Sequence, residues 1–176
     1  KSTMLLHLNG LLTGAGGTIH VFGRELAGNE PKLLAEIRAT VGVVFQDPDD
    51  QLFSPTIAED VAFGPLYMGL PEDEVDRRVE EALRMVHLGG YENRMPHHLS
   101  GGEKKRAAMA AVLSMRPRIL CLDEPSAGLD PRARRGLIEL LKELEQTILV
   151  TTHDMHMVRE IFPRDRKSTR LNSSHV

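Results

Sequence analysis

The chain has 176 residues, which is the size of one domain and enough to bury a sizeable core. Apolar residues make up 41% and charged residues 27%, as in ordinary globular proteins, and the net charge of -3 argues against a nucleic-acid partner held by bulk electrostatics. No apolar stretch approaches the roughly 20 residues that cross a bilayer, so a membrane role would have to come through a partner.

The first three residues, Lys1, Ser2 and Thr3, lead directly into a segment of helical character, Met4 to Leu8. In a phosphate-binding loop, a Lys-Ser/Thr pair follows a glycine-rich turn and enters a helix; the lysine reaches the phosphates and the hydroxyl binds magnesium. An ordinary polar N-terminus would have the same composition. Because no strand and no glycine-rich loop precede Lys1, we expect the chain to be a fragment that begins inside such a loop.

Strand and helix patterns alternate in the next part of the chain. A short strand is predicted at 18–22, after a glycine-rich turn, and a short helix at 31–39. The apolar run 41–45 is typical of a strand buried on both faces of a parallel sheet, and it ends at Gln46. The segment 47–55, which follows, is rich in turn residues.

Two helices are predicted next, at 56–68 and 71–88. In the second, apolar residues recur at helical spacing, at Val75, Val79 and Leu83, and Pro71 suits a first turn. We expect these helices to form a separate helical lobe.

A glycine pair opens the helix predicted at 101–115. Ser100 and Glu103 match a capping box, which by itself would indicate only a well-started helix. Gly101 and Gly102 occupy the first helical positions, where glycine costs stability. Glycines at that place make sense if the backbone N–H groups must approach an anion closely, and this favours a phosphate.

Buried strands are predicted at 118–122 and 147–151, with a helix at 131–146 between them that Asp130 would cap. Strands that alternate with helices indicate an α/β fold with a parallel sheet. Cys121, the single cysteine, lies in the first of these strands and is expected to be a buried, inert thiol.

Polar residues follow both of these strands. Asp123 and Glu124 come directly after the first, and His153 ends the second, so the three should meet at the carboxyl edge of the sheet. Adjacent acids suit phosphoryl transfer: Asp123 could hold the magnesium shell, and Glu124 could orient or deprotonate the attacking water. His153 could hydrogen-bond a γ-phosphate, although a lone histidine is more often a surface residue.

In this order, five segments resemble the Q-loop, signature, Walker B, D-loop and H-loop of an ABC transporter nucleotide-binding domain: Gln46, Leu99–Glu103, Leu122–Pro125, Ser126–Asp130 and Thr152–Asp154. The resemblance covers residues 1–164. It implies an α/β fold, a P-loop NTPase ABC-type core with a parallel sheet and an inserted helical subdomain. The core would comprise 1–55 and 101–164, and the helical subdomain 56–100.

The resemblance also implies the site and its cofactors, ATP and Mg²⁺. Two copies would enclose two ATP molecules, with residues from both copies at each nucleotide. One copy would supply the phosphate-binding Lys1, Ser2 and Thr3, the magnesium ligands Ser2, Gln46 and Asp123, and the catalytic residues Gln46, Glu124 and His153. The opposite copy would supply Ser100, Gly101 and Gly102, and Asp130 of the D-loop is also expected at the nucleotide.

Three further segments resemble the ATP-binding subunits of energy-coupling-factor importers, especially the cobalt/nickel group: Phe45–Phe53, Glu59–Pro65 and Pro96–Leu99. The resemblance implies uptake of cobalt or nickel, or alternatively of a vitamin. The partners would be a second ATPase subunit, identical or related, and transmembrane transporter subunits, which would place the protein peripherally at the cytoplasmic face of the membrane. His97 and His98 lack a third placed ligand and are expected to be polar loop residues.

Two other classes remain possible. Soluble ABC ATPases act on DNA or ribosomes, but the DNA-clamping ones insert a long coiled coil where this chain has a compact lobe between Gln46 and Leu99. A degenerate regulatory cassette is disfavoured by the intact Glu124 and His153.

The segment 165–176 is polar and basic, and residues 165–175 match an in-frame translation of a common short-read sequencing adapter. We expect this tail to be non-native. We also expect the 176-residue polypeptide not to hydrolyse ATP by itself, because most of its phosphate-binding loop is missing, whereas the full gene product would.

Overall fold

The computed structural model describes residues 2–12, 16–26 and 30–162. Lys1 and the tail 165–176 lie outside the described residues. The elements are, in chain order, α1 (Ser2–Leu8), β1 (His20–Val21), β2 (Arg24–Glu25), α2 (Pro31–Thr40), β3 (Val41–Val44), η1 (Pro48–Asp50), α3 (Ile57–Tyr67), α4 (Glu72–Met85), η2 (Pro96–His98), α5 (Gly101–Leu113), β4 (Ile119–Asp123), α6 (Pro131–Glu143), β5 (Thr147–Thr151) and α7 (Met155–Ile161).

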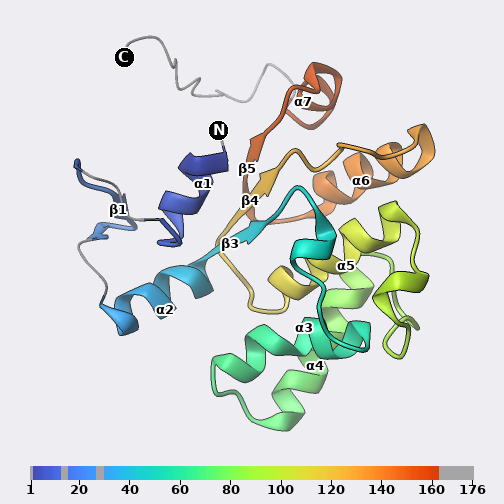
Figure 1. The fold of residues 1–176 in the computed structure, drawn as a ribbon, viewed down its shortest axis with the longest axis horizontal. Coiled ribbons are helices and arrows are strands. Elements are labelled where there is room, and N and C mark those ends of the chain that lie inside the picture. Colours follow the sequence, from blue (N-terminus) through green and yellow to red (C-terminus); the bar gives the residue numbers. More distant parts are fainter. Residues whose placement is uncertain (1, 13–15, 27–29, 163–176) are drawn as a thin grey trace.

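A parallel sheet with the strand order β3-β4-β5 forms the centre of the fold (Figure 1). Leu120 and Leu122 of β4 are fully buried among side chains of α5 and α6, whereas Cys121 packs on the other face with Leu5 of α1 and Ile37 of α2. Alternate residues of β4 therefore point into two separate apolar clusters. The layered arrangement confirms the predicted α/β fold with a parallel sheet.

The strand β5 is less buried than its sequence predicts. Thr147 is exposed, the apolar residues 148–150 are half-buried, and only Thr151 is buried. Within the described residues β5 pairs with β4 alone, so one of its edges has no neighbouring strand there. Position in the sheet, rather than composition, sets the burial of this apolar segment.

The strand predicted at 18–22 is only two residues long and forms an antiparallel hairpin with β2. Phe22 (φ 50°) and Gly23 (φ 77°) form its turn, and both have the left-handed backbone that a tight two-residue hairpin favours. The partner strand, Arg24–Glu25, was not predicted because its residues carry no apolar alternation.

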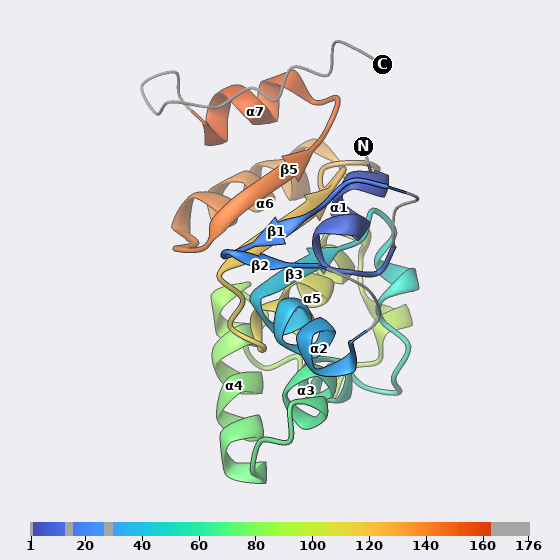
Figure 2. The same cartoon turned by 90° about the vertical axis from the view of Figure 1, so that its left-hand side faces the viewer.

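The helices α3 and α4 pack against α5 below the sheet (Figure 2). The predicted apolar face of α4 is the buried one, with Val75, Val79 and Leu83 inside. Ser114, just after α5, is buried and donates its hydroxyl to the carbonyl oxygen of Val61 (2.8 Å), which fixes α3 to the end of α5. The predicted helices exist, and the structure ends several of them a few residues earlier.

Helix α5 also lies directly on β3. A Cβ atom added at Gly42 would lie 2.2 Å from Val112 Cγ1 and 3.2 Å from the Pro117 ring. Only a residue without a side chain allows this close approach of strand and helix.

Candidate functional site

The carboxyl edge of the sheet brings Glu124 and His153 together, as predicted. Three donors converge on one oxygen, Oε2 of Glu124: the Thr152 hydroxyl (3.0 Å), the His153 backbone N–H (3.3 Å) and His153 Nδ1 (2.9 Å). An ionised carboxylate only accepts hydrogen bonds, so Nδ1 carries the proton of the imidazole. Among the described residues no side chain donates to the other oxygen, Oε1, which leaves it free to accept from a water molecule.

Burial raises the pKa of the Glu124 carboxyl, but the hydrogen bonds from His153 and Thr152 outweigh burial and hold the pKa below its usual value. Glu124 is therefore an ionised acceptor at neutral pH. The exposed part of the pair is the imidazole, whose side chain is 79% accessible against 17% for Glu124. Nε2 of His153 consequently faces solvent.

The backbone of Glu124 is strained. Its φ of 43° lies in the left-handed region, which costs a residue with a side chain about 1 to 2 kcal/mol. The Glu124 N–H donates to the Thr151 carbonyl oxygen (2.8 Å), so the turn is fixed to the end of β5. This conformation directs the carboxylate toward Thr152 and His153.

Asp123 and Gln46 lie at the same edge of the sheet. Val44 is opposite Leu122 in the parallel register; Gln46 lies two residues beyond β3, and Asp123 is the last residue of β4. The Thr151 hydroxyl donates to Asp123 Oδ1. The amide of Gln46 is exposed. Carboxylate and amide oxygens are hard donors of the kind that Mg²⁺ prefers, so this donor set fits the predicted metal.

Ser2 and Thr3 begin α1, which packs on β3 and β4 through Leu5. Both residues are exposed. Within the described part of the chain, their side chains make no hydrogen bond to Gln46, Asp123 or Glu124. The structure thus places this helix on the sheet without joining the predicted magnesium ligands to one another.

The start of α5 has the predicted capping box. Glu103 N–H donates to Ser100 Oγ (3.4 Å), and Glu103 Oε2 accepts from the Ser100 N–H (2.8 Å). The Ser100 hydroxyl also donates to Glu103 Oε2 (2.6 Å), and this bond, with those from the Ser100 N–H and the Tyr91 hydroxyl, lowers the pKa of Glu103 to about 2. Within the described residues the N–H groups of Gly101 and Gly102 have no acceptor, as the first turn of a helix leaves them.

The two glycines of this turn differ in their surroundings. A Cβ atom at Gly102 would lie 2.8 Å from Ala133 Cβ, so this glycine allows α5 to approach α6. A Cβ atom at Gly101 would meet nothing within 4 Å. Packing within the chain explains Gly102, whereas Gly101 has open space in front of it.

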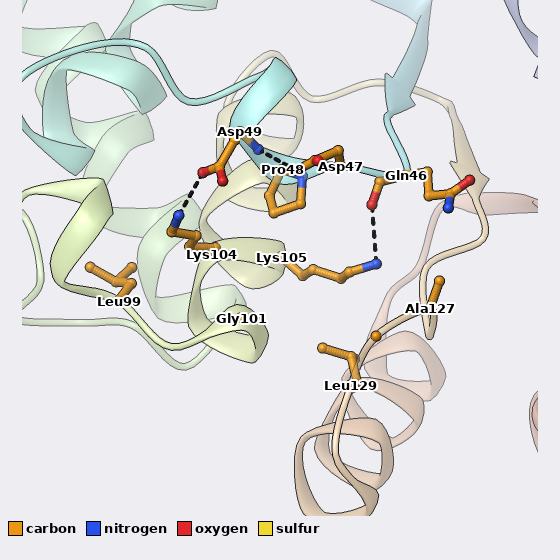
Figure 3. Close-up of a pocket in the computed structure, with 11 residues that line it drawn as sticks. Gln46, Asp47, Pro48, Asp49, Leu99, Gly101, Lys104, Lys105, Ala127 and Leu129 are labelled. Carbon is orange, nitrogen blue, oxygen red and sulfur yellow. Dashed lines mark hydrogen bonds and ion pairs between the residues drawn. The ribbon is translucent and has the colours of Figure 1, made fainter.

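Asp130 caps α6: its Oδ1 accepts from the N–H groups of Arg132 (2.8 Å) and Ala133 (2.9 Å). These bonds lower the pKa of its carboxyl. The predicted cap is confirmed. Between Gln46, Gly101 and Leu129 lies a polar cavity of about 450 Å³, so the Q-loop, α5 and the D-loop share one hollow (Figure 3).

An apolar groove of about 670 Å³ lies on the other side of the Q-loop, between α3, α5 and β3. Its rim carries exposed aromatic rings, Phe53 (67%), Phe63 (54%) and Tyr67 (77%). Asp60 also lines the groove and is 3% exposed; its Oδ1 accepts from the N–H groups of Phe53 and Ser54, but Oδ2 is buried and has no partner among the residues that the structure describes. We call this hollow the aromatic groove. No helix in the described ranges is long and apolar enough to span a membrane.

Several contacts at the sheet edge were missed from the sequence. Thr152 and Asp154, which flank His153, hold Glu124 and α7 respectively; Asp154 accepts a two-pronged ion pair from Arg134 and a hydrogen bond from Ser126. Lys105 was also missed. It shares a helix face with Ala108, Met109 and Val112, and a lysine on such an apolar stripe is a signal that could have been used.

Comparisons with known proteins give the family of this chain. The ABC transporter family model matches residues 1–127. The chain is 52% identical over 167 residues to the energy-coupling factor transporter ATP-binding protein EcfA of Methanothermobacter thermautotrophicus, a match that covers 93% of this chain and 53% of that protein. It is 53% identical over 167 residues to a putative ABC transporter ATP-binding protein of Geobacter sulfurreducens, covering 93% and 65%. The chain spans about half the length of curated relatives such as the EcfA protein.

Solved structures share the fold. CbiO1 from Clostridium perfringens, described as part of the ABC transporter complex cbiONQ, has a TM-score of 0.78 at 42% identity, with 89% of this chain and 64% of that chain covered. The ATP-binding cassette MJ0796, in a dimeric post-hydrolysis state bound to ADP and Pi, has a TM-score of 0.78 at 29% identity, with 90% and 72% covered. With the family model matching most of the chain, the protein belongs to the ABC transporter family.

Proposed function

We propose that the full protein hydrolyses ATP and thereby energises a membrane importer. The observation that carries this proposal is the Glu124 carboxylate, which is ionised and held on one oxygen by Thr152 and His153 while the other oxygen stays free. An anchored carboxylate with one open oxygen can orient a water molecule and take its proton.

The neighbouring residues support the same reaction. Ser2, Gln46 and Asp123 would hold Mg²⁺, with the phosphate contacts of Lys1 and Thr3 beside them. The bound metal would neutralise charge on the phosphates. His153 would hydrogen-bond the γ-phosphate through Nε2; because Nδ1 already donates to Glu124, only the protonated ring can donate from Nε2.

The second half of each site would come from a second ATPase subunit. Ser100 and Gly101 are exposed, and the N–H groups at the start of α5 are open to an anion. Gly101 has no packing neighbour that would explain a glycine. Asp130 lines a neighbouring hollow together with Ser100 and Gly102. ATP-driven closure of such a dimer would supply the motion that drives transport.

The aromatic groove would receive the transmembrane subunits, in keeping with a core of 1–55 and 101–164 and an inserted helical subdomain of 56–100. Exposed Phe53, Phe63 and Tyr67 would bury apolar surface of a membrane partner. The protein would then lie peripherally on the cytoplasmic face of the membrane. Its cargo would be cobalt or nickel ions, as the resemblance to energy-coupling-factor ATPases implies, or alternatively a vitamin.

Glu124→Gln in the full-length protein tests the ATPase. We expect hydrolysis to fall by at least about 100-fold, because the amide cannot accept the water's proton, while ATP binding persists. Glu145→Gln is the matched control, since Glu145 is exposed and removed from the sheet edge. Unchanged turnover in Glu124→Gln would remove this residue from its proposed role.

Tyr67→Ser tests the groove. The ring is 77% exposed, so its loss should leave the melting temperature unchanged while it weakens co-purification with the membrane subunits and uptake of radioactive cobalt in cells. Vitamin uptake measured in the same cells separates the two cargoes. Full co-purification of the variant would exclude the groove as the docking site.

A further inference from the structure

Lys105 lies in the second turn of α5, where its side chain is enclosed between two loops. The residue is 9% exposed. Its Nζ donates to the backbone carbonyl oxygen of Gln46 (3.2 Å) and to that of Glu124 (3.4 Å). Figure 3 shows the side chain extending across the cavity to Gln46. One ammonium group therefore joins the backbones of two proposed catalytic residues that are far apart in the chain.

Burial of an ammonium group at this position is energetically unfavourable. The other residues on its helix face, Ala108, Met109 and Val112, are buried and apolar, and burial lowers the pKa of Lys105, although the Asp47 and Glu124 carboxylates oppose this. An apolar residue would serve packing alone. The cation is matched instead to two carbonyl oxygens in loops outside the sheet: that of Gln46, and that of Glu124, which also accepts from the Ala127 N–H (3.0 Å).

The contact with Glu124 falls where the backbone is strained. Glu124 has a φ of 43°, and its N–H is fixed by the Thr151 carbonyl. Lys105 holds the carbonyl on the other side of the same residue. A strained residue keeps its conformation only when contacts with the surrounding structure hold it there, and the contact with Lys105 is one of these.

We propose that Lys105 is a positioning residue: by bridging the Gln46 and Glu124 carbonyls, it fixes the Q-loop to the turn that carries the catalytic carboxylate. This inference rests on the proposed ATPase function. Lys105 touches neither nucleotide nor water in this role. It would make the position of Glu124 depend on that of the Q-loop, and thus on whatever occupies the aromatic groove beside it.

The test uses the full-length protein with three variants. Lys105→Met keeps the length of the side chain and removes the ammonium, Lys105→Arg keeps a cationic donor, and Lys104→Met removes the same charge one residue earlier, where the ion pair is with the largely exposed Asp49 (2.6 Å). We expect Lys105→Met to lower kcat about tenfold with KM for ATP within about twofold, Lys105→Arg to restore most of kcat, and Lys104→Met to resemble the wild type.

Amide hydrogen exchange gives a readout without hydrolysis. In Lys105→Met, exchange should accelerate together in 46–51 and in 124–129, whereas β4, the central strand, should exchange as in the wild type. Three results would each overturn the proposal. They are amide exchange that rises throughout the protein, a loss of kcat in Lys104→Met equal to that in Lys105→Met, and a kcat that Lys105→Arg does not restore. If the wild type itself shows no hydrolysis that depends on Glu124, the proposed function fails. If the wild type hydrolyses ATP and Lys105→Met is equally active, only the positioning role of Lys105 is refuted.

Discussion

The carboxyl edge of the sheet and the start of α5 are built in opposite ways. At the sheet edge, the Glu124 carboxylate is held by residues that follow another strand, Thr152 and His153, and its backbone by Thr151. At the start of α5, the pairing of Ser100 with Glu103 is complete within four consecutive residues. One region depends on tertiary structure, and the other is nearly self-contained.

The two regions also differ in what they leave open. The sheet edge has a buried framework and one free carboxylate oxygen, whereas the start of α5 presents exposed backbone N–H groups with no partner in front of Gly101. The first arrangement suits chemistry on a nucleotide, and the second suits contact with an anion brought by another molecule. This difference supports two half-sites that complete each other between subunits.

Mixed dimers of the full-length protein give the strongest test of whether the two half-sites complete each other between subunits. Gly101→Asp should fold, since its side chain meets open space and an acid suits a first helical turn, but it should repel phosphate. A dimer with Gly101→Asp in one subunit and Glu124→Gln in the other keeps one complete site. A dimer with both changes in one subunit keeps none. We expect ATP hydrolysis to differ about 100-fold between them, and equal rates would contradict shared sites.

Substitution of His153 tests the sheet edge alone. His153→Ala removes a donor to Glu124 and the exposed Nε2 together, so kcat of the full-length protein should fall about 100-fold. His156→Ala is the control: it lies one turn later, its side chain is 80% exposed, and it pairs with Glu160. Similar losses in both variants would assign the effect to α7 rather than to the site.

A smaller effect is expected from Thr152→Val, which removes one of three hydrogen bonds on Glu124 Oε2. These bonds lower the pKa of Glu124, so their partial loss raises it and shifts the acid limb of the pH–rate profile to higher pH. At neutral pH kcat should fall about fivefold. Thr147→Val, at the exposed start of β5, should leave the profile unmoved.

The smallest effect should come from the cap of α5. Glu103 has a pKa of about 2 in the fold against an ordinary value of 4.5, so its ionised form adds stability above pH 4.5, and the contribution is lost as pH falls toward 2. Glu103→Gln should lower the free energy of unfolding by about 1 kcal/mol at pH 7 and by less at pH 4. Urea titrations at both pH values measure this, and a penalty that grows with acidity would exclude the charged cap.

The contrast also explains which features were predictable from the sequence. The capping box, the Asp130 cap and the buried strand before Asp123 depend on neighbouring residues, and the patterns alone indicated them. Parallel pairing then brought Asp123, Glu124 and His153 to one edge. The left-handed turn at Glu124 and the convergence of Lys105 on two loops require packing between distant segments, which no local pattern encodes. The exposure of β5 likewise depends on its place in the sheet.

The close contact at Gly42 has a mechanical consequence. The contact lies in the floor of the aromatic groove, where both Gly42 and Val112 are found. Because no side chain separates β3 from α5, we expect a displacement of one to move the other: β3 leads into Gln46, and α5 begins at Gly101. A methyl group at position 42 would force the two apart. We therefore expect the contact at Gly42 to couple the positions of the two proposed half-sites of one subunit.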